Sequence, residues 1–97
     1  MKQLMHFTAK WCTPCKAMEP VIEDFRRRHP DVIYTKVDID DDMQTAVDFA
    51  VMGVPTFISI IDENLFERKS GRATIFQLEA LFNWLLYLKK SNYFIIY

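Results

Sequence analysis

The sequence feature that most restricts the fold of this chain is the stretch AKWCTPCKAME, residues 9–19, which holds both cysteines. Two residues separate Cys12 from Cys15. An apolar segment precedes the pair and an amphipathic segment follows it, so the cysteines lie where a strand expected at 3–7 gives way to a helix expected at 12–28. Such a pair can be a structural disulfide, half of a metal site or a reactive dithiol.

Length and composition indicate one domain, because the chain has 97 residues, of which 51% are hydrophobic and 26% charged. The net charge of −1 gives no basic excess of the kind that nucleic acid requires, and the basic run at 26–29 is better explained as the exposed end of a helix. No segment is apolar over the roughly 18 residues that span a bilayer, and the N-terminus lacks the apolar region of a signal peptide. We therefore expect a cytoplasmic monomer without nucleic-acid or membrane partners.

Hydrophobic periodicity predicts four strands and three helices. The expected strands cover residues 3–7, 32–39, 54–61 and 65–70, and the expected helices cover residues 12–28, 40–51 and 74–90. Pro20 should kink the first helix because it removes a backbone donor. The first β-α-β unit should be parallel, and the turn at 62–64 should make the last two strands a hairpin. The predicted class is α/β, a mixed four-stranded sheet with helices on both faces, in a domain at 1–90 followed by an apolar tail at 91–97.

A reactive dithiol explains the cysteine pair best. Cys12 would lie at the carboxyl end of a parallel strand and in the first turn of a helix, where unpaired amides stabilise an anion such as a thiolate. We expect Cys12 to be the exposed nucleophile and Cys15, one turn further in, to be the more buried resolving thiol. Two cysteines three positions apart can close a disulfide with little backbone movement, and Pro14 suits a first turn, where its missing N–H costs little.

A zinc site is the weaker alternative. Cys12, Cys15, His6 and His29 supply four candidate ligands, but no second histidine follows at finger-like spacing. Cys12 and His29 would also stand roughly 25 Å apart on one helix. A structural disulfide that closes so short a loop would stabilise little. We therefore expect no metal and no organic cofactor.

Two motifs carry a family likeness. WCTPCK resembles the active-site motif of the thioredoxin family, Trp-Cys-x-Pro-Cys-Lys, and GVPTF at 53–57 resembles that family's Gly-Ile/Val-Pro-Thr segment. Pro20 resembles the family's helix-kinking proline, and Lys36 its strand lysine. The likeness covers residues 2 to about 88 and implies a thioredoxin-like fold, β-α-β-α-β-β-α, that lacks the usual N-terminal strand and helix.

The resemblance also implies a set of site residues. Cys12 and Cys15 would be the catalytic pair and would form the redox disulfide, with His6 and Lys36 below them. The substrate-binding residues would be Trp11, Pro14, Met52, Gly53, Val54, Pro55 and Gly71. A cis peptide before Pro55 would leave the preceding backbone free to pair with a substrate in strand fashion. His6 stands where the family has a buried aspartate, and we expect it to be either a proton-transfer base or a core histidine. Because Lys36 should lie nearby and two cations would repel each other, we expect His6 to be neutral.

The implied activity is the reduction of protein disulfides by the dithiol, which a thioredoxin reductase would regenerate. A glutaredoxin-like enzyme reduced by glutathione is one alternative, but WCTPCK differs from the Cys-Pro-Tyr-Cys kind of motif. A non-catalytic thioredoxin-fold assembly subunit is the other. The tail at 91–97 has no counterpart in the family, and it is expected to cover apolar surface or to dock a partner.

Overall fold

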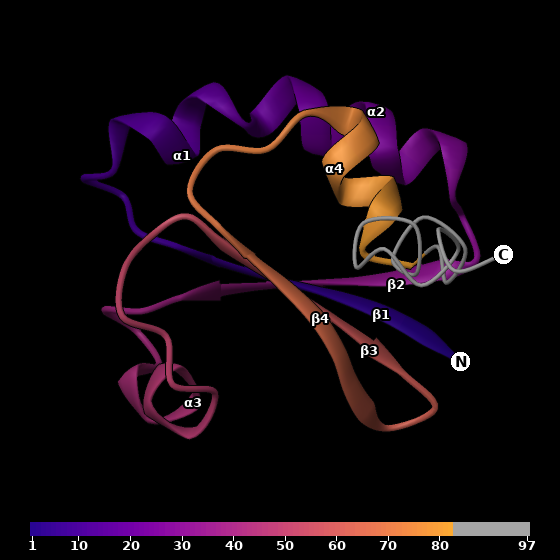
Figure 1. Ribbon diagram of the computed structural model, residues 1–97. Coiled ribbons are helices and arrows are strands. Elements are labelled where there is room, and N and C mark those ends of the chain that lie inside the picture. Colours follow the sequence, from indigo (N-terminus) through magenta and orange to yellow (C-terminus); the bar gives the residue numbers. More distant parts are fainter. Residues whose placement is uncertain (83–97) are drawn as a thin grey trace, which may run out of the picture.

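The computed structural model describes residues 1–82 and shows one sheet with helices on both faces (Figure 1). The strands are β1 (Lys2–Thr8), β2 (Val32–Asp38), β3 (Thr56–Ile61) and β4 (Asn64–Ser70). The helices are α1 (Thr13–Ala17), α2 (Glu19–Arg28), α3 (Met43–Asp48) and α4 (Ile75–Ala80). The expected order is confirmed, with the first helix divided into α1 and α2. The prediction of helix up to residue 90 and the tail at 91–97 lie outside the described residues.

The four strands lie in the order β2-β1-β3-β4. β1 and β2 are parallel, whereas β1 with β3 and β3 with β4 are antiparallel, which confirms the mixed sheet and the final hairpin. The register places His6 of β1 between Lys36 of β2 and Phe57 of β3. Sheet pairing therefore brings the first strand's histidine to the centre of the sheet.

The first predicted helix breaks at Met18, which ends α1 and begins α2. Pro20 has no N–H to donate to the Lys16 carbonyl four positions earlier, so the continuous hydrogen-bond ladder cannot form there. The Met18 N–H instead donates to the Cys15 carbonyl oxygen at 3.1 Å. The kink is thus confirmed, and it lies between the short cysteine-bearing helix and the longer α2.

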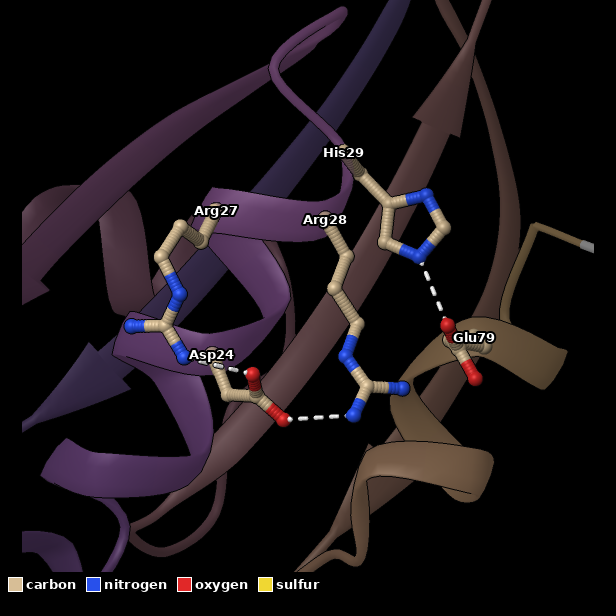
Figure 2. Close-up of polar contacts among 5 residues, drawn as sticks. All are labelled: Asp24, Arg27, Arg28, His29 and Glu79. Atoms are coloured by element: carbon tan, nitrogen blue, oxygen red, sulfur yellow. Dashed lines mark hydrogen bonds and ion pairs between the residues drawn. The ribbon is translucent and has the colours of Figure 1, made fainter.

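One face of the sheet is covered by α1, α2 and α4, and the other by α3 (Figure 1). The first face holds a cluster of buried apolar side chains from β1, the helices and β3, and from the segment before α4: Leu4, Met18, Ile22, Phe25, Phe57, Ala73, Leu78 and Leu81. At the end of α2, His29 Nε2 lies 2.7 Å from Glu79 Oε2 on α4, as Figure 2 shows beside the Asp24 ion pairs. This contact ties the two helices together beyond the apolar core.

The opposite face is packed more lightly. Its buried cluster is Met5, Phe7, Val37, Ala46 and Ile58. The periodicity of Met43 and Val47 predicts a helix, and α3 is present, but these two side chains are 62% and 64% exposed. Ala46 is the residue that α3 buries, because a small side chain lets the short helix approach the sheet.

Candidate active site

The two cysteines lie where β1 passes into α1. Cys12 is the N-cap of α1 and Cys15 lies within it, and the two are joined by a disulfide with their Cα atoms 5.2 Å apart. The Cys15 N–H donates a hydrogen bond to Cys12 Sγ at 3.2 Å. The Ile39 N–H at the end of β2 donates to the Thr8 carbonyl oxygen at 3.0 Å. The pair therefore sits at the carboxyl ends of two parallel strands, as the sequence predicts.

Both cysteines are buried, with only 4% of Cys12 and 3% of Cys15 exposed. They form one cluster with Ala9, and Ile39 and Val54 pack against it. The prediction of an exposed Cys12 is therefore wrong for the disulfide-bonded state, whereas Cys15 is buried as predicted. The reason is that side chains from the ends of two other elements cover the bridge, which local helix geometry could not reveal.

The segment before β3 turns toward the cysteines through a cis peptide at Val54–Pro55, as the resemblance implies. The Pro55 carbonyl oxygen accepts a hydrogen bond from the Gly71 N–H at 2.8 Å. The Thr56 hydroxyl donates to the Gly53 carbonyl oxygen at 2.7 Å. Gly71 has φ of 85°, a left-handed conformation that favours glycine. The first bond joins the start of β3 to the end of β4, and the second closes the turn that leads into β3.

A cavity of about 370 Å³ opens over this segment, and we call it the proline groove. It is lined by Ala50, Met52, Gly53, Val54, Pro55, Thr56, Arg68, Ser70 and Gly71. Five of the seven expected substrate-binding residues thus lie together in one groove. Met52 at its rim is 97% exposed, although it is a large apolar side chain. Its side chain is therefore free to contact a partner that enters the groove.

The other two expected substrate-binding residues lie outside the proline groove. Trp11 is 66% exposed, and its Nε1–H donates to Asp40 Oδ2 at 2.9 Å. Pro14 is exposed in the first turn of α1. Both residues flank Cys12 in the sequence, so they form the rim of the cysteine pair on the helix side. Asp40 was not foreseen, because its bond to Trp11 joins residues 29 positions apart.

A second cavity, of about 650 Å³, opens beside Cys15, and we call it the histidine groove. It is lined by His6, Thr8, Ala9, Lys10, Cys15, Lys16, Glu19, Ile22, Glu23, Arg26, Tyr34, Lys36 and Asp38. Three of the four expected catalytic residues, His6, Cys15 and Lys36, therefore share this groove. Lys36 is exposed there, one strand away from His6.

His6 is 2% exposed and its ring stacks on Phe57, with the ring centroids 4.7 Å apart. Its Nδ1 lies 2.8 Å from the Tyr34 hydroxyl oxygen. Its Nε2 is buried with no hydrogen-bond partner among the described residues. Burial, and next the charge of Lys36, lower the pKa of His6 from 6.5 to about 4. The imidazole is therefore uncharged at neutral pH, as expected.

Tyr34 is a site residue that the sequence reading missed. Burial is the largest influence on its hydroxyl and raises the pKa of Tyr34 to about 12, so the hydroxyl keeps its proton. The Arg26 guanidinium lies over the Tyr34 ring, 4.7 Å from its centroid. The sequence could have indicated Tyr34, because side chains of a strand alternate between the two faces of a sheet. Tyr34 and Lys36, two positions apart in β2, therefore lie on the same face.

Within residues 1–82, no three side chains among His, Cys, Asp and Glu gather in a way that could hold a metal ion. In this same part of the chain, no helix is long and apolar enough to cross a membrane.

Two cysteines that close a disulfide at the end of a parallel strand can exist as a dithiol or as a disulfide, which places the chain among dithiol–disulfide redox proteins. The sequence model of Thioredoxin matches residues 1–84, and the chain belongs to the thioredoxin family. Thioredoxin H3 of Arabidopsis thaliana is 39% identical over 70 residues, which are 72% of this chain and 59% of that protein. The chain thus spans less than two thirds of that plant relative.

Other similar proteins cover more of the chain. A thioredoxin of Buchnera aphidicola is 34% identical over 87 residues, which are 89% of this chain and 78% of the relative. The structure of Fasciola hepatica thioredoxin matches with a TM-score of 0.77 and 31% identity, covering 84% of this chain and 78% of that one. Oxidised mitochondrial thioredoxin 3 of Saccharomyces cerevisiae matches with a TM-score of 0.75 and 35% identity, covering 80% and 73%. These matches confirm the thioredoxin-like fold.

Proposed function

We propose that this chain reduces disulfide bonds in partner proteins through Cys12 and Cys15. The Cys12 thiolate attacks one sulfur of the partner's disulfide, and a mixed disulfide forms while the second partner sulfur leaves as a thiolate. The Cys15 thiolate then attacks Cys12 Sγ, which releases the first partner sulfur and closes the Cys12–Cys15 disulfide. Two electrons pass to the partner, and a thioredoxin reductase returns them. The protein acts as a cytoplasmic monomer in this proposal.

One observation carries the proposal. Cys12 and Cys15 are already joined in a disulfide, and the Cys15 N–H donates to Cys12 Sγ at 3.2 Å. In the dithiol form, the same amide would donate to the Cys12 thiolate, and a hydrogen bond to the charged form favours it. A thiolate at neutral pH is the nucleophile that disulfide exchange requires.

The proline groove suits the partner chain. Val54 packs against the cysteine cluster and also lines the groove, so a chain that pairs with its backbone would pass beside the disulfide. Met52, Gly53 and Gly71 would contact the partner on one side of the sulfurs, and Trp11 on the other.

His6 is proposed to assist the second step. It lines the same groove as Cys15, and its uncharged ring has a lone pair that can accept the Cys15 proton. With its pKa lowered to about 4, the imidazolium would hold the proton only briefly and release it to solvent in the histidine groove. Lys36 lies beside His6 in the register, and its positive charge would favour this release.

Reduction of insulin with NADPH and a thioredoxin reductase tests the proposed activity. We expect wild-type turnover to exceed that of Cys12→Ser by at least about 10³-fold, because the nucleophile is lost. Thr13→Ser, which leaves both sulfurs in place, serves as the matched control. Equal activity of Cys12→Ser and wild type would contradict the reductase and favour a non-catalytic subunit. Reduction only with glutathione would favour the glutaredoxin-like alternative.

A further inference from the structure

Arg68 on β4 reaches across to the end of α3. Its Nη2 donates to the Phe49 carbonyl oxygen at 2.6 Å, and its Nη1 lies 3.4 Å from the Ala50 carbonyl oxygen. The last carbonyl groups of a helix have no partner within the helix, and the Arg68 guanidinium supplies donors for them. Ala50 has φ of 54°, so the chain turns sharply at this point. Arg68 therefore anchors the start of the segment that runs from the end of α3 to Met52.

The same guanidinium lines the proline groove, where it is the one charged group among the described lining residues. A guanidinium has five N–H donors, and within the part of the chain that the structure describes the two carbonyl bonds occupy two of them, which leaves three for a partner. The two bonds also hold the guanidinium in place before a partner binds. This lowers the entropic cost of ordering the Arg68 side chain when it pairs with a group of the partner. The remaining lining residues of the groove are apolar, small or hydroxylic.

We propose that Arg68 determines substrate preference and selects partner chains that carry a carboxylate close to the half-cystine that Cys12 attacks. A planar guanidinium matches a carboxylate in two parallel hydrogen bonds, and a basic side chain at the same place would be repelled. This inference rests on the proposed reductase function, because it assigns a substrate class to the same site. Arg68 would bind the partner's carboxylate and would not contact the reacting sulfurs.

The test uses two disulfide peptides that differ only in Glu or Lys beside the half-cystine. We expect wild type to reduce the Glu peptide with about three- to fivefold higher kcat/KM, the size of effect that one partly exposed ion pair produces. Arg68→Met should bring this ratio to about one. Lys69→Met is the matched control, because it removes the same charge from the neighbouring position, where the side chain lies on the other face of the strand and bonds to the Ser70 carbonyl oxygen.

Arg68→Lys separates charge from position. It should keep part of the preference while KM rises for both peptides, because one ammonium group cannot hold both carbonyl oxygens. The wild-type preference should also weaken as salt is raised from 0.05 to 0.5 M, an order-of-magnitude range over which screening becomes strong. Thermal unfolding and the redox potential of the cysteine pair show whether each variant keeps its fold.

Several results would overturn the inference. An equal preference in wild type and Arg68→Met, or a preference that salt leaves unchanged, would remove Arg68 as the selecting residue while the reductase function stands. A lost preference in Lys69→Met would assign the effect to net charge. If wild type reduced neither peptide although its disulfide opens and closes, the proposed function would fail, and this inference with it.

Discussion

Two grooves of different chemical character adjoin the cysteine cluster: Cys15 lines one, and Val54, which packs against the cluster, lines the other. Among residues 1–82, the proline groove has a single charged lining residue, Arg68, and Met52 in its lining exposes an apolar side chain. The histidine groove is larger and has seven charged side chains: Lys10, Lys16, Glu19, Glu23, Arg26, Lys36 and Asp38. An apolar groove suits the binding of a partner chain, whereas a charged groove is hydrated and suits the movement of protons. This difference supports the proposal that the partner binds in the proline groove and that a proton leaves through the histidine groove.

The two sulfurs differ in their relation to these grooves. Cys15 lines the histidine groove, whereas Val54, which lines the proline groove, packs against the cluster that holds both cysteines. In the proposed mechanism, a partner in the proline groove meets Cys12 first, and Cys15, which lines the histidine groove, then completes the reaction. This division predicts that substitutions in the proline groove change KM. Substitutions in the histidine groove should instead change the rate and the pH profile of mixed-disulfide release.

The largest expected effect follows from Cys15→Ser. The mixed disulfide with Cys12 should then persist, since no second sulfur can release the partner, and turnover should fall by at least about 10³-fold. A disulfide-bonded adduct with the peptide should appear by mass spectrometry without reductant. Cys12→Ser is the control and should give no adduct. An adduct with Cys12→Ser and none with Cys15→Ser would reverse the assignment of the two sulfurs.

Histidine protonation should dominate the loss of stability in mild acid. The pKa of His6 is near 6.5 in an unfolded chain and about 4 in the fold. Between these values the unfolded chain binds more protons, so the free energy of unfolding falls as pH decreases from 6.5 to 4, by about 3 kcal/mol in total. His6→Asn should lack this fall in urea titrations across that range. Parallel curves for the two proteins would show that His6 titrates normally.

The carboxylates offer an internal check on that measurement. A hydrogen bond from Thr45 lowers the pKa of Asp42, and a hydrogen bond from the N-terminal amine lowers the pKa of Asp62. Stability that depends on these ionised groups is present above their unfolded pKa values and is lost as pH falls through the lower folded values. Wild type and His6→Asn share this loss. The difference between their free energies of unfolding at each pH therefore measures the contribution of the His6 imidazole.

Much of this arrangement could be predicted from the sequence because it depends on neighbouring residues. Strand alternation, helical periodicity and the turn at 62–64 are local, and they specify the order of the elements. The two motifs indicated the disulfide and the cis peptide before Pro55, which lie at matching positions in the family. The break at Met18 follows from Pro20 alone.

The parts that the sequence did not reveal depend on distant contacts. Cys12 is buried because Ile39 and Val54 reach it from the ends of other elements. His6 and Tyr34 meet only through the parallel register of β1 and β2. Such contacts are set by tertiary packing, which periodicity does not encode, and for this reason the sequence predicts an exposed Cys12 where the structure buries it.

Substitution of His6 should have a smaller effect, on the rate of the second step and not on partner binding. If His6 accepts the Cys15 proton, His6→Ala should slow the release of the mixed disulfide by about tenfold or more near neutral pH and change its pH profile, with little change in KM. His6→Phe is the matched control, because it keeps a ring to stack on Phe57 but has no nitrogen. Single-turnover release measured between about pH 5 and 9, the range in which His and Cys titrate, provides the test. A profile identical to wild type in both variants would leave His6 as a core residue.

The smallest effect belongs to the proline groove and should appear in KM alone. Met52 is 97% exposed, so Met52→Ala should leave the free energy of unfolding unchanged. In a complex the side chain would become partly buried, and its loss should raise KM for a disulfide peptide by about threefold without changing the pH profile. Met43→Ala is the matched control, because Met43 is also exposed but does not line the groove. An equal rise in KM for both variants would mean that the partner covers α3 as well, and the division between the two grooves would then no longer describe where the partner binds.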